Sequence, residues 1–240
     1  MDEFELIRRF FSRPSDSPAV VAGVGDDGYG MGMCVGDIDG DGFLDLVCGN
    51  FDQSNLLYLF QPQEQEFTAE PSWQSRPDWH EYNTRCIALG DVDSDGYLDL
   101  VCGNDGEPNT LYLGSPVTYF TQDPTWSSSD SSPTHSILLT DVDGDGDLDL
   151  LCGNHGAPTT LYRNENNRLT ENPVWFSDES APTTCLAGGD IDRDGDLDVL
   201  SASQNDNKIA WYENTAGDGS AWATNVISTA ATPAIRPEIP

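Results

Sequence analysis

The feature that most constrains the fold of this chain is a ten-residue segment that occurs four times. The first copy, residues 37–46, reads DIDGDGFLDL, and near copies begin at Asp91, Asp141 and Asp190. The first aspartates of successive copies lie 54, 50 and 49 residues apart. A regular period of this size is typical of a propeller, a solenoid or another array of equivalent units. The chain is therefore predicted to be a repeat protein.

Each repeat is predicted to form four short strands. An apolar run precedes the acidic segment, as at residues 86–89, and a second one follows it, as at residues 98–102. A third strand is expected at four pairs that end in tyrosine, 57–58, 111–112, 161–162 and 211–212, and a fourth at the Pro-x-Trp segments 71–73, 124–126 and 173–175. Short strands joined by Gly, Pro and Asn turns indicate an all-β, β-propeller-like array of four to five four-stranded blades.

The repeats divide the chain near residues 31–83, 84–133, 134–182 and 183–229. Residues 1–30 are expected to form an N-terminal segment, with a short helix over residues 2–11 and a strand over residues 19–22. Residues 230–240 are expected to be a tail. Three arrangements are open: residues 1–30 could complete a blade with residues 220–229, two copies could form one larger ring, or the chain could be part of a larger propeller.

The charge balance excludes some partners. The chain has 42 acidic and 10 basic residues, which give a formal net charge of −32. Such a chain repels nucleic acids and anionic membrane surfaces, so neither is an expected partner. The sequence also has no apolar run long enough for a signal peptide or a membrane span. The expected counterparts of these acidic residues are cations.

The acidic segments follow the pattern Asp-x-Asp-x-Asp-Gly-x-x-Asp, which is suited to a hard metal ion. Carboxylates at alternate positions can converge in a tight turn, and glycine at the sixth position permits the backbone conformation that the turn requires. The seventh residue offers its carbonyl oxygen, and the ninth offers a further carboxylate. Oxygen ligands in this number favour Ca²⁺ over Mg²⁺ and over soft transition metals.

About four bound calcium ions are therefore expected. The predicted ligands are Asp37, Asp39, Asp41, Phe43 and Asp45 in the first segment, Asp91, Asp93, Asp95, Tyr97 and Asp99 in the second, Asp141, Asp143, Asp145, Asp147 and Asp149 in the third, and Asp190, Asp192, Asp194, Asp196 and Asp198 in the fourth. These segments differ from an EF-hand because the twelfth position carries cysteine or serine in place of glutamate, and because the flanking residues are strand-like.

The run from Tyr29 to Asp37, YGMGMCVGD, and the segment after it resemble an FG-GAP repeat of integrin alpha-chain propellers. The later units, such as residues 88–104 and 208–214, are similar to the related VCBS-type repeats of secreted proteins. The resemblance covers about residues 29–228 and implies a calcium-binding β-propeller that binds a protein or a glycan as an adhesion-type module. It also implies an extracellular or secreted location. The chain departs from the family in having Tyr29 in place of phenylalanine and in lacking the usual seven blades.

A carbohydrate-active enzyme or a lectin built on the same propeller is the alternative. No catalytic motif of a hydrolase, a P-loop protein or a dinucleotide-binding enzyme occurs, so a non-catalytic protein is expected. His80 beside Trp79 is the local group that most resembles a site. The three Pro-x-Trp tryptophans are expected to pack against the next sheet, whereas Trp79 and Trp222 lie outside that register and are the better candidates for exposed binding residues.

The six cysteines are interpreted mainly as small buried residues. Cys48, Cys102 and Cys152 occupy the same position in successive repeats, which does not favour disulfides between them. A cross-strand bridge between Cys34 and Cys48 is conceivable if the hairpin centres on Asp41. No spacing typical of a zinc site occurs.

Overall fold

The computed structural model describes residues 20–21, 32–75, 83–204 and 206–229. Every helix or strand that it assigns within these ranges is a β-strand, and every strand pair is antiparallel. The all-β prediction is therefore confirmed. The helix predicted for residues 2–11 lies outside the described residues. Within the described ranges, no helical segment has the length and apolarity needed to span a bilayer.

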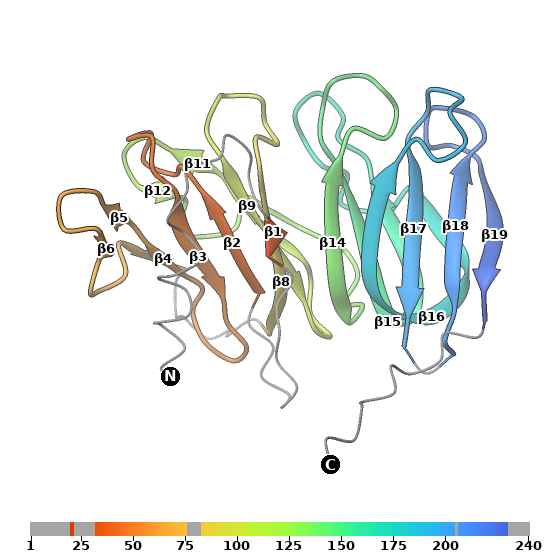
Figure 1. Ribbon diagram of the computed structural model, residues 1–240, viewed down its shortest axis with the longest axis horizontal. Coiled ribbons are helices and arrows are strands. Elements are labelled where there is room, and N and C mark those ends of the chain that lie inside the picture. The colour runs from red at the N-terminus through yellow and green to blue at the C-terminus, as the bar shows by residue number, and fades with distance from the viewer. Residues whose placement is uncertain (1–19, 22–31, 76–82, 205, 230–240) are drawn as a thin grey trace, which may run out of the picture.

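The first two repeats form two separate sheets (Figure 1). Blade 1 contains, in spatial order, β1 (Val20–Val21), β2 (Gly32–Gly36), β3 (Asp45–Gly49), β4 (Leu56–Tyr58) and β7 (Trp73–Gln74), with a small hairpin of β5 (Phe60–Gln61) and β6 (Glu66–Phe67). Blade 2 contains β8 (Thr84–Gly90), β9 (Asp99–Asn104), β10 (Thr110–Tyr112) and β13 (Trp126–Ser127), with a hairpin of β11 (Gly114–Ser115) and β12 (Tyr119–Phe120).

The last two repeats share one six-stranded sheet. Its strands are β14 (Thr134–Thr140), β15 (Asp149–Tyr162), β16 (Trp175–Gly189), β17 (Asp198–Ser203), β18 (Ile209–Asn214) and β19 (Trp222–Ser228). The start of β15 pairs with β14 and its end pairs with β16, whereas the second part of β16 pairs with β17. Two long strands therefore each supply two blade strands, and blades 3 and 4 are continuous where the sequence predicted separate strands.

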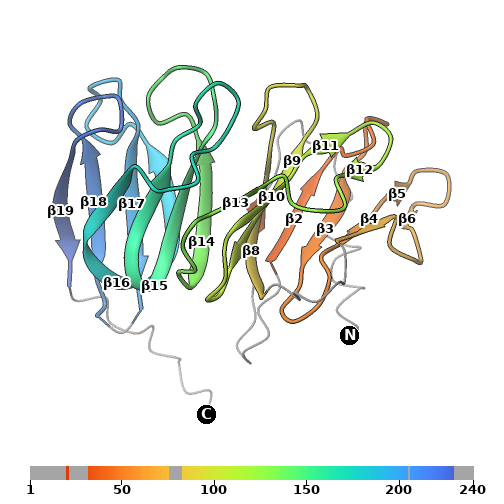
Figure 2. The same cartoon turned by 180° about the vertical axis from the view of Figure 1, so that it is seen from behind.

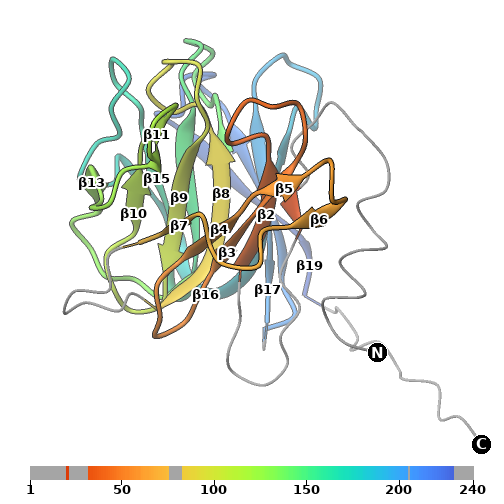
Figure 3. The same cartoon turned by 90° about the vertical axis from the view of Figure 1, so that its left-hand side faces the viewer.

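The inner strands of successive blades contact one another. Strand β2 contacts β8, β8 contacts β14, and β14 contacts β16, so the four blades follow each other around one side of a propeller (Figures 2 and 3). Strand β1 pairs with β2, and β19 pairs with β18. The described residues therefore do not form the ring-closing pairing between residues 1–30 and residues 220–229.

Each hydrophobic core lies between two blades, and a tryptophan forms part of it. Trp73 meets Tyr112 of blade 2 edge to face at 5.6 Å between ring centroids, and Trp126 meets Tyr162 of blade 3 at 5.4 Å. Trp175 meets Tyr212 of blade 4 in the same way at 5.5 Å. Each such pair contributes about 0.5–1.5 kcal/mol beyond the burial of its area. The prediction that these tryptophans pack against the next sheet is confirmed.

The prediction that Trp222 is an exposed binding residue is wrong. Its ring lies 5.0 Å from that of Trp175, and its Nε1–H donates to the carbonyl oxygen of Gly219 at 2.8 Å. Trp222 is half-buried because it packs against the core between blades 3 and 4. Trp79 and His80 lie outside the described residues.

The conceivable Cys34–Cys48 bridge does not form, because the register of the hairpin differs by one residue from a centre at Asp41. Cys34 pairs with Val47 and Met33 pairs with Cys48, so the two cysteines project from opposite faces of the sheet. Both are free thiols. Cys102 and Cys152 are fully buried, as predicted, and each accepts a hydrogen bond at 3.3 Å from an asparagine of the preceding blade, Asn55 and Asn109 respectively.

Candidate metal centres

Four acidic loops connect the first and second strands of the blades and lie at the same end of the molecule, at the top of Figure 1. We name them loop 1 (residues 37–45), loop 2 (91–99), loop 3 (141–149) and loop 4 (190–198). The glycine at the sixth position has φ between 90° and 102° in every loop, which confirms the predicted requirement for glycine. The fourth position is also left-handed, although it carries Ser94 in loop 2 and Arg193 in loop 4. Because only two of the four loops carry glycine at the fourth position, the sequence pattern did not indicate a second left-handed residue there.

The carboxylates at the start of each loop organise its backbone. In loop 1, Asp37 accepts a hydrogen bond from the N–H of Gly42 at 3.0 Å, and Asp41 accepts one from the N–H of Phe43 at 2.9 Å. The N–H of Asp41 in turn donates to Asp39 at 3.1 Å. These short-range bonds hold the turn and direct several carboxylates toward its interior.

The ninth aspartate of each loop is buried and ties the loop to the rest of its blade. In loop 2, one oxygen of Asp99 accepts from the N–H of Val92 at 2.7 Å, and the other accepts from the N–H of Gly114, beyond the third strand, at 2.6 Å. The same pair of bonds is made by Asp45, Asp149 and Asp198. The ninth position therefore has a structural role in addition to any role in metal binding.

The loops hold carboxylates under electrostatic strain. Burial raises the pKa of Asp45, Asp99 and Asp149 to about 6, although backbone N–H groups bonded to these carboxylates act in the opposite direction. At the third position, partial desolvation and the neighbouring carboxylates also raise the pKa; this affects Asp39, Asp93, Asp143 and Asp192. A bound cation would relieve this strain by stabilising the ionised forms.

Each loop brings three carboxylates together, with one oxygen of each lying within 4.8 Å of the others. The residues are Asp37, Asp39 and Asp41 in loop 1, Asp91, Asp93 and Asp99 in loop 2, Asp141, Asp143 and Asp149 in loop 3, and Asp190, Asp192 and Asp194 in loop 4. Oδ1 of Asp37 and Oδ1 of Asp93 are buried and have no hydrogen-bond partner among the described residues. An anionic oxygen in that position needs a cation or a donor, so the donor set fits a hard metal ion.

The remaining predicted ligands are placed nearby but not within these groups. The fifth aspartates of loops 2 and 3 and the ninth aspartates of loops 1 and 4 lie in the same loops without joining the group of three. At the seventh position, the backbone N–H groups of Phe43, Tyr97, Asp147 and Asp196 donate to the fifth aspartate. Metal coordination by the carbonyl oxygens of these four residues stays a prediction.

Two asparagines that contact the loops were not identified from the sequence. Nδ2 of Asn164 donates to the carbonyl oxygen of Val92 in loop 2 at 2.7 Å, and Nδ2 of Asn214 donates to that of Val142 in loop 3 at 3.1 Å. Each asparagine therefore links its blade to the acidic loop of the preceding blade. The repeated Tyr-x-Asn at residues 162–164 and 212–214 is the signal that could have indicated them.

Loop 3 also has a basic neighbour. The guanidinium group of Arg163 forms an ion pair with Asp143 at 3.3 Å and donates a hydrogen bond to the carbonyl oxygen of Asp218. Leu59, Leu113 and Glu213 occupy the corresponding positions in the other blades. The spacing of the aspartates gave no signal for this residue, which makes loop 3 less negative than its sequence implies.

The fold and the loops define a β-propeller whose blades carry acidic turns at one end. The model of the FG-GAP-like repeat matches residues 37–102, 91–152 and 141–201, which together span more than half of the chain. The chain belongs to this repeat family. None of the curated proteins matches this chain.

Solved structures share the fold at low sequence identity. BBS1N in complex with ARL6DN matches with a TM-score of 0.55 at 11% identity in a mercury-soaked crystal, over 88% of this chain and 60% of that one. A lead-soaked crystal of the same complex gives a TM-score of 0.54 at 12% identity, over 88% and 57% of the two chains. An Agrocybe aegerita lectin that recognises non-reducing terminal N-acetylglucosamine matches with a TM-score of 0.53 at 14% identity, over 84% and 53%. The chain thus spans little more than half the length of these proteins, and the likeness concerns the fold.

Proposed function

We propose that the chain is a calcium-stabilised β-propeller that serves as a non-catalytic interaction module. The observation that carries the calcium proposal is the group of three carboxylate oxygens within 4.8 Å in each of the four loops. Two of these loops also contain a buried carboxylate oxygen without a hydrogen-bond partner among the described residues. Bound Ca²⁺ would supply the positive charge that offsets repulsion between the aspartates.

The residues proposed to hold the ions are the aspartates of the four loops, together with the carbonyl groups at the seventh position. Their oxygen atoms are hard ligands, which suit Ca²⁺ better than a soft transition metal. The ninth aspartate would contribute to binding while its bonds to backbone N–H groups keep the loop on its blade. Calcium would then connect the first two strands of each blade and act as a structural element.

The proposed partner is a protein or a glycan that contacts the propeller surface. Exposed aromatic side chains at the loop end support this role, because Phe43 is 45% exposed and Tyr97 is 40% exposed. Exposed aromatic residues supply contact area at a low cost in conformational entropy. Membership in the FG-GAP-like repeat family supports an adhesion-type role of this kind. The proposal includes no catalytic step.

We further propose an extracellular location and an additional contact at blade 4. Extracellular calcium is plentiful enough for loops of modest affinity. Burial raises the pKa of the Cys102 and Cys152 thiols, so these cysteines would be unreactive in an oxidising environment.

Val226 and Ile227 of β19 are more than half exposed, which favours cover by a second copy of the chain or by a further blade. Light scattering in calcium would test this by giving the molar mass.

Thermal unfolding with and without calcium tests the central proposal. A ligand that binds only the native state stabilises it by about 2.7 kcal/mol at a hundredfold excess over its Kd. Four such sites would add on the order of 10 kcal/mol, which corresponds to a rise in Tm of about 20 °C or more. Calorimetric titration should give about four bound ions per chain.

The control separates binding at the loops from general screening of the negative charge. Magnesium at the same concentration screens a charge of −32 equally well but is a poor match for these loops. An equal rise in Tm with both ions would contradict specific calcium sites. An unchanged Tm on addition of chelator would contradict the proposal as a whole.

A further inference from the structure

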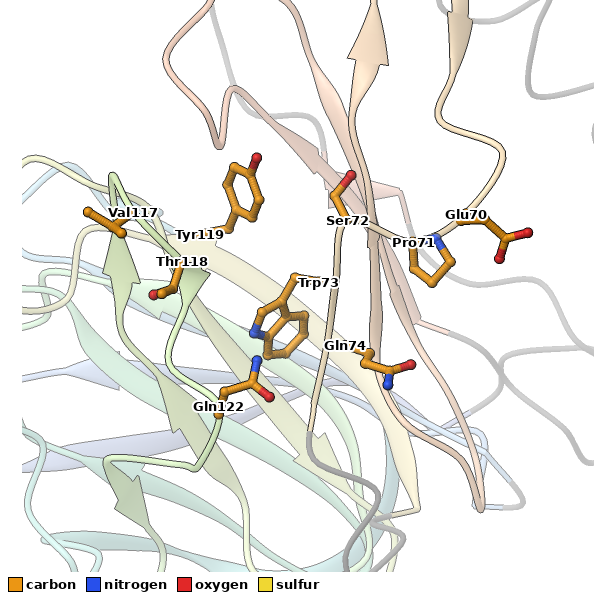
Figure 4. Close-up of a pocket in the computed structure, with 9 residues that line it drawn as sticks. All are labelled: Glu70, Pro71, Ser72, Trp73, Gln74, Val117, Thr118, Tyr119 and Gln122. Carbon is orange, nitrogen blue, oxygen red and sulfur yellow. The ribbon is translucent and has the colours of Figure 1, made fainter.

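A pocket lies between blades 1 and 2, away from the carboxylate groups of the acidic loops. Its volume is about 500 Å³, within the range of small-molecule sites. One wall is strand β7 with the residues before it, and the other is the β11–β12 hairpin with Gln122 (Figure 4). The two walls come from different repeats, so the pocket exists only because the blades pack together.

Trp73 forms the base of this pocket and has an unused hydrogen-bond donor. Its side chain is 4% exposed, and its Nε1–H is buried without a hydrogen-bond partner among the described residues. Its ring is fixed by edge-to-face contacts with Tyr112 and Phe120 of blade 2. A buried donor without a partner costs about 1–3 kcal/mol, so the free protein retains a group that a ligand acceptor would satisfy.

The equivalent tryptophan in the next blade shows what an ordinary packing residue does at this position. Nε1–H of Trp126 donates to the carbonyl oxygen of Thr170 in blade 3 at 3.2 Å. The tryptophan therefore has a backbone acceptor at the boundary between blades 2 and 3, but at the boundary between blades 1 and 2 it has none among the described residues. Trp211 also has a buried Nε1–H without a partner among the described residues, so the pocket beside Trp73 is the further observation that points to binding.

The rim of the pocket also differs from the same place in the other blades. Tyr119 stands opposite Ser115 in its hairpin, where the corresponding residues are Glu66 in blade 1 and Arg168 in blade 3. Its φ of 62° belongs to the hairpin turn, since Gln65 and Asn167 are also left-handed in the corresponding turns of blades 1 and 3. Its ring lines the pocket together with Trp73 (Figure 4).

The other rim residues determine the class of ligand. Gln74 and Gln122 are exposed and offer amide donors and acceptors, and Glu70 is the one charged residue among the described residues of the lining. Aromatic rings pack against the C–H faces of a sugar, while amide groups bond its hydroxyls. An acidic ligand is disfavoured by Glu70 and by the net charge of −32. These features together fit a neutral saccharide.

We propose that this pocket binds a neutral saccharide unit, with Trp73 Nε1–H donating to a ligand oxygen and Tyr119 packing against the ring. Gln122 and Trp73 both line this pocket (Figure 4). The inference rests on the proposed interaction role and assigns one ligand class to it.

Screening neutral mono- and oligosaccharides on a glycan array in excess calcium, followed by calorimetric titration of the ligands found, tests the proposal. Trp73→Phe keeps an aromatic ring against Tyr112 and Phe120 but removes the N–H, so binding should weaken about tenfold. Gln122→Ala changes an exposed residue and should weaken binding several-fold without affecting folding. Trp126→Phe is the matched control: it removes the same N–H from the next blade and should leave binding unchanged.

Binding that is equal in the Trp73→Phe and Trp126→Phe variants would overturn the proposal, as would the absence of any bound neutral saccharide. A peptide that binds the pocket in place of every saccharide would overturn it as well. The thermal melts distinguish this failure from failure of the calcium proposal. If saccharide binding depends on Trp73 and calcium does not change Tm, the pocket proposal alone is supported. If calcium raises Tm and no saccharide binds, the calcium proposal alone is supported.

Discussion

Loops 1–3 and loop 4 have the same sequence pattern but different surroundings. The second residue of each loop is apolar: Ile38, Val92 and Val142 are buried in the cores between successive blades, whereas Ile191 is 41% exposed. The first three side chains are covered by the following blade, and no described blade follows loop 4. The repeat pattern therefore specifies the conformation of a loop, while its neighbour determines how strongly that loop is held.

The largest expected difference follows from placing a charge at the second position. Val142 is 2% exposed, so Val142→Asp would bury an unpaired carboxylate and reduce the free energy of unfolding by about 4 kcal/mol or more. Ile191→Asp changes a partly exposed residue, and we expect a loss of about 1 kcal/mol or less. Denaturant unfolding in excess calcium compares the two variants.

If Val142→Asp prevents folding, the losses in the free energy of unfolding of Val142→Ala and Ile191→Ala can be compared in the same way, because alanine is a milder change. Equal losses in the two blades would mean that Ile191 is covered in solution. Light scattering on the same samples would then show whether a second copy provides the cover.

A smaller effect is expected from pH in the calcium-free protein. Because folding raises the pKa of Asp45, Asp99 and Asp149 to about 6, their stabilising contribution is present at low pH and is lost as the pH rises through 6. Lowering the pH from 7 to 5 in chelator should therefore raise Tm by roughly 5 to 10 °C. His135 acts in the opposite direction, since burial and Arg85 lower its pKa, but it is one group against three.

The same titration in excess calcium gives the contrast. Calcium binds the ionised carboxylates, so protons compete with it and Tm should fall as the pH is lowered. A Tm that rises toward pH 5 in both conditions would show that the buried aspartates of loops 1–3 do not take part in metal binding.

The smallest of the three effects concerns the links between blades. Asn164→Ala removes hydrogen bonds from Nδ2 to the carbonyl oxygens of Val92 and Leu148, at 2.7 and 3.2 Å, and should cost about 2 kcal/mol. Asn225→Ala is the control, because the Nδ2 of Asn225 donates to a side chain of its own sheet, Glu213, at 3.3 Å and its loss should cost about 0.5 kcal/mol or less. Chemical denaturation measures both, and equal costs would contradict a linking role for Asn164.

The sequence predicted most of what is local. The four-strand pattern, the left-handed glycine of each acidic loop and the packing of the Pro-x-Trp tryptophans all follow from short-range spacing and from the burial of aromatic residues, and the structure confirms them. The Cys34–Cys48 bridge, which the sequence left conceivable, does not form because a shift of one residue in register moves a side chain to the other face. Trp222 was misassigned because its place in the core depends on a ring from another strand, that of Trp175.

The candidate sites divide in the same way. Which aspartates lie in each loop could be read from the sequence, but not which three converge, because the ninth aspartate joins the group in loops 2 and 3 and the fifth aspartate joins it in loops 1 and 4. Arg163, Asn164 and Asn214 were missed because each acts on a loop through long-range contacts. The pocket at Trp73 was missed because its walls belong to different repeats.

By itself, the sequence determined that this chain is an array of β-blades with an acidic turn in each, because strand period, turn glycines and carboxylate spacing are properties of neighbouring residues. Only the tertiary structure decided what differs among these similar units: which loop is covered, which Pro-x-Trp tryptophan finds a backbone acceptor in the next blade, and where a basic residue meets an acidic loop. The physical reason is that burial and hydrogen-bond partners at these places are supplied by the adjacent blade, dozens of residues away along the chain.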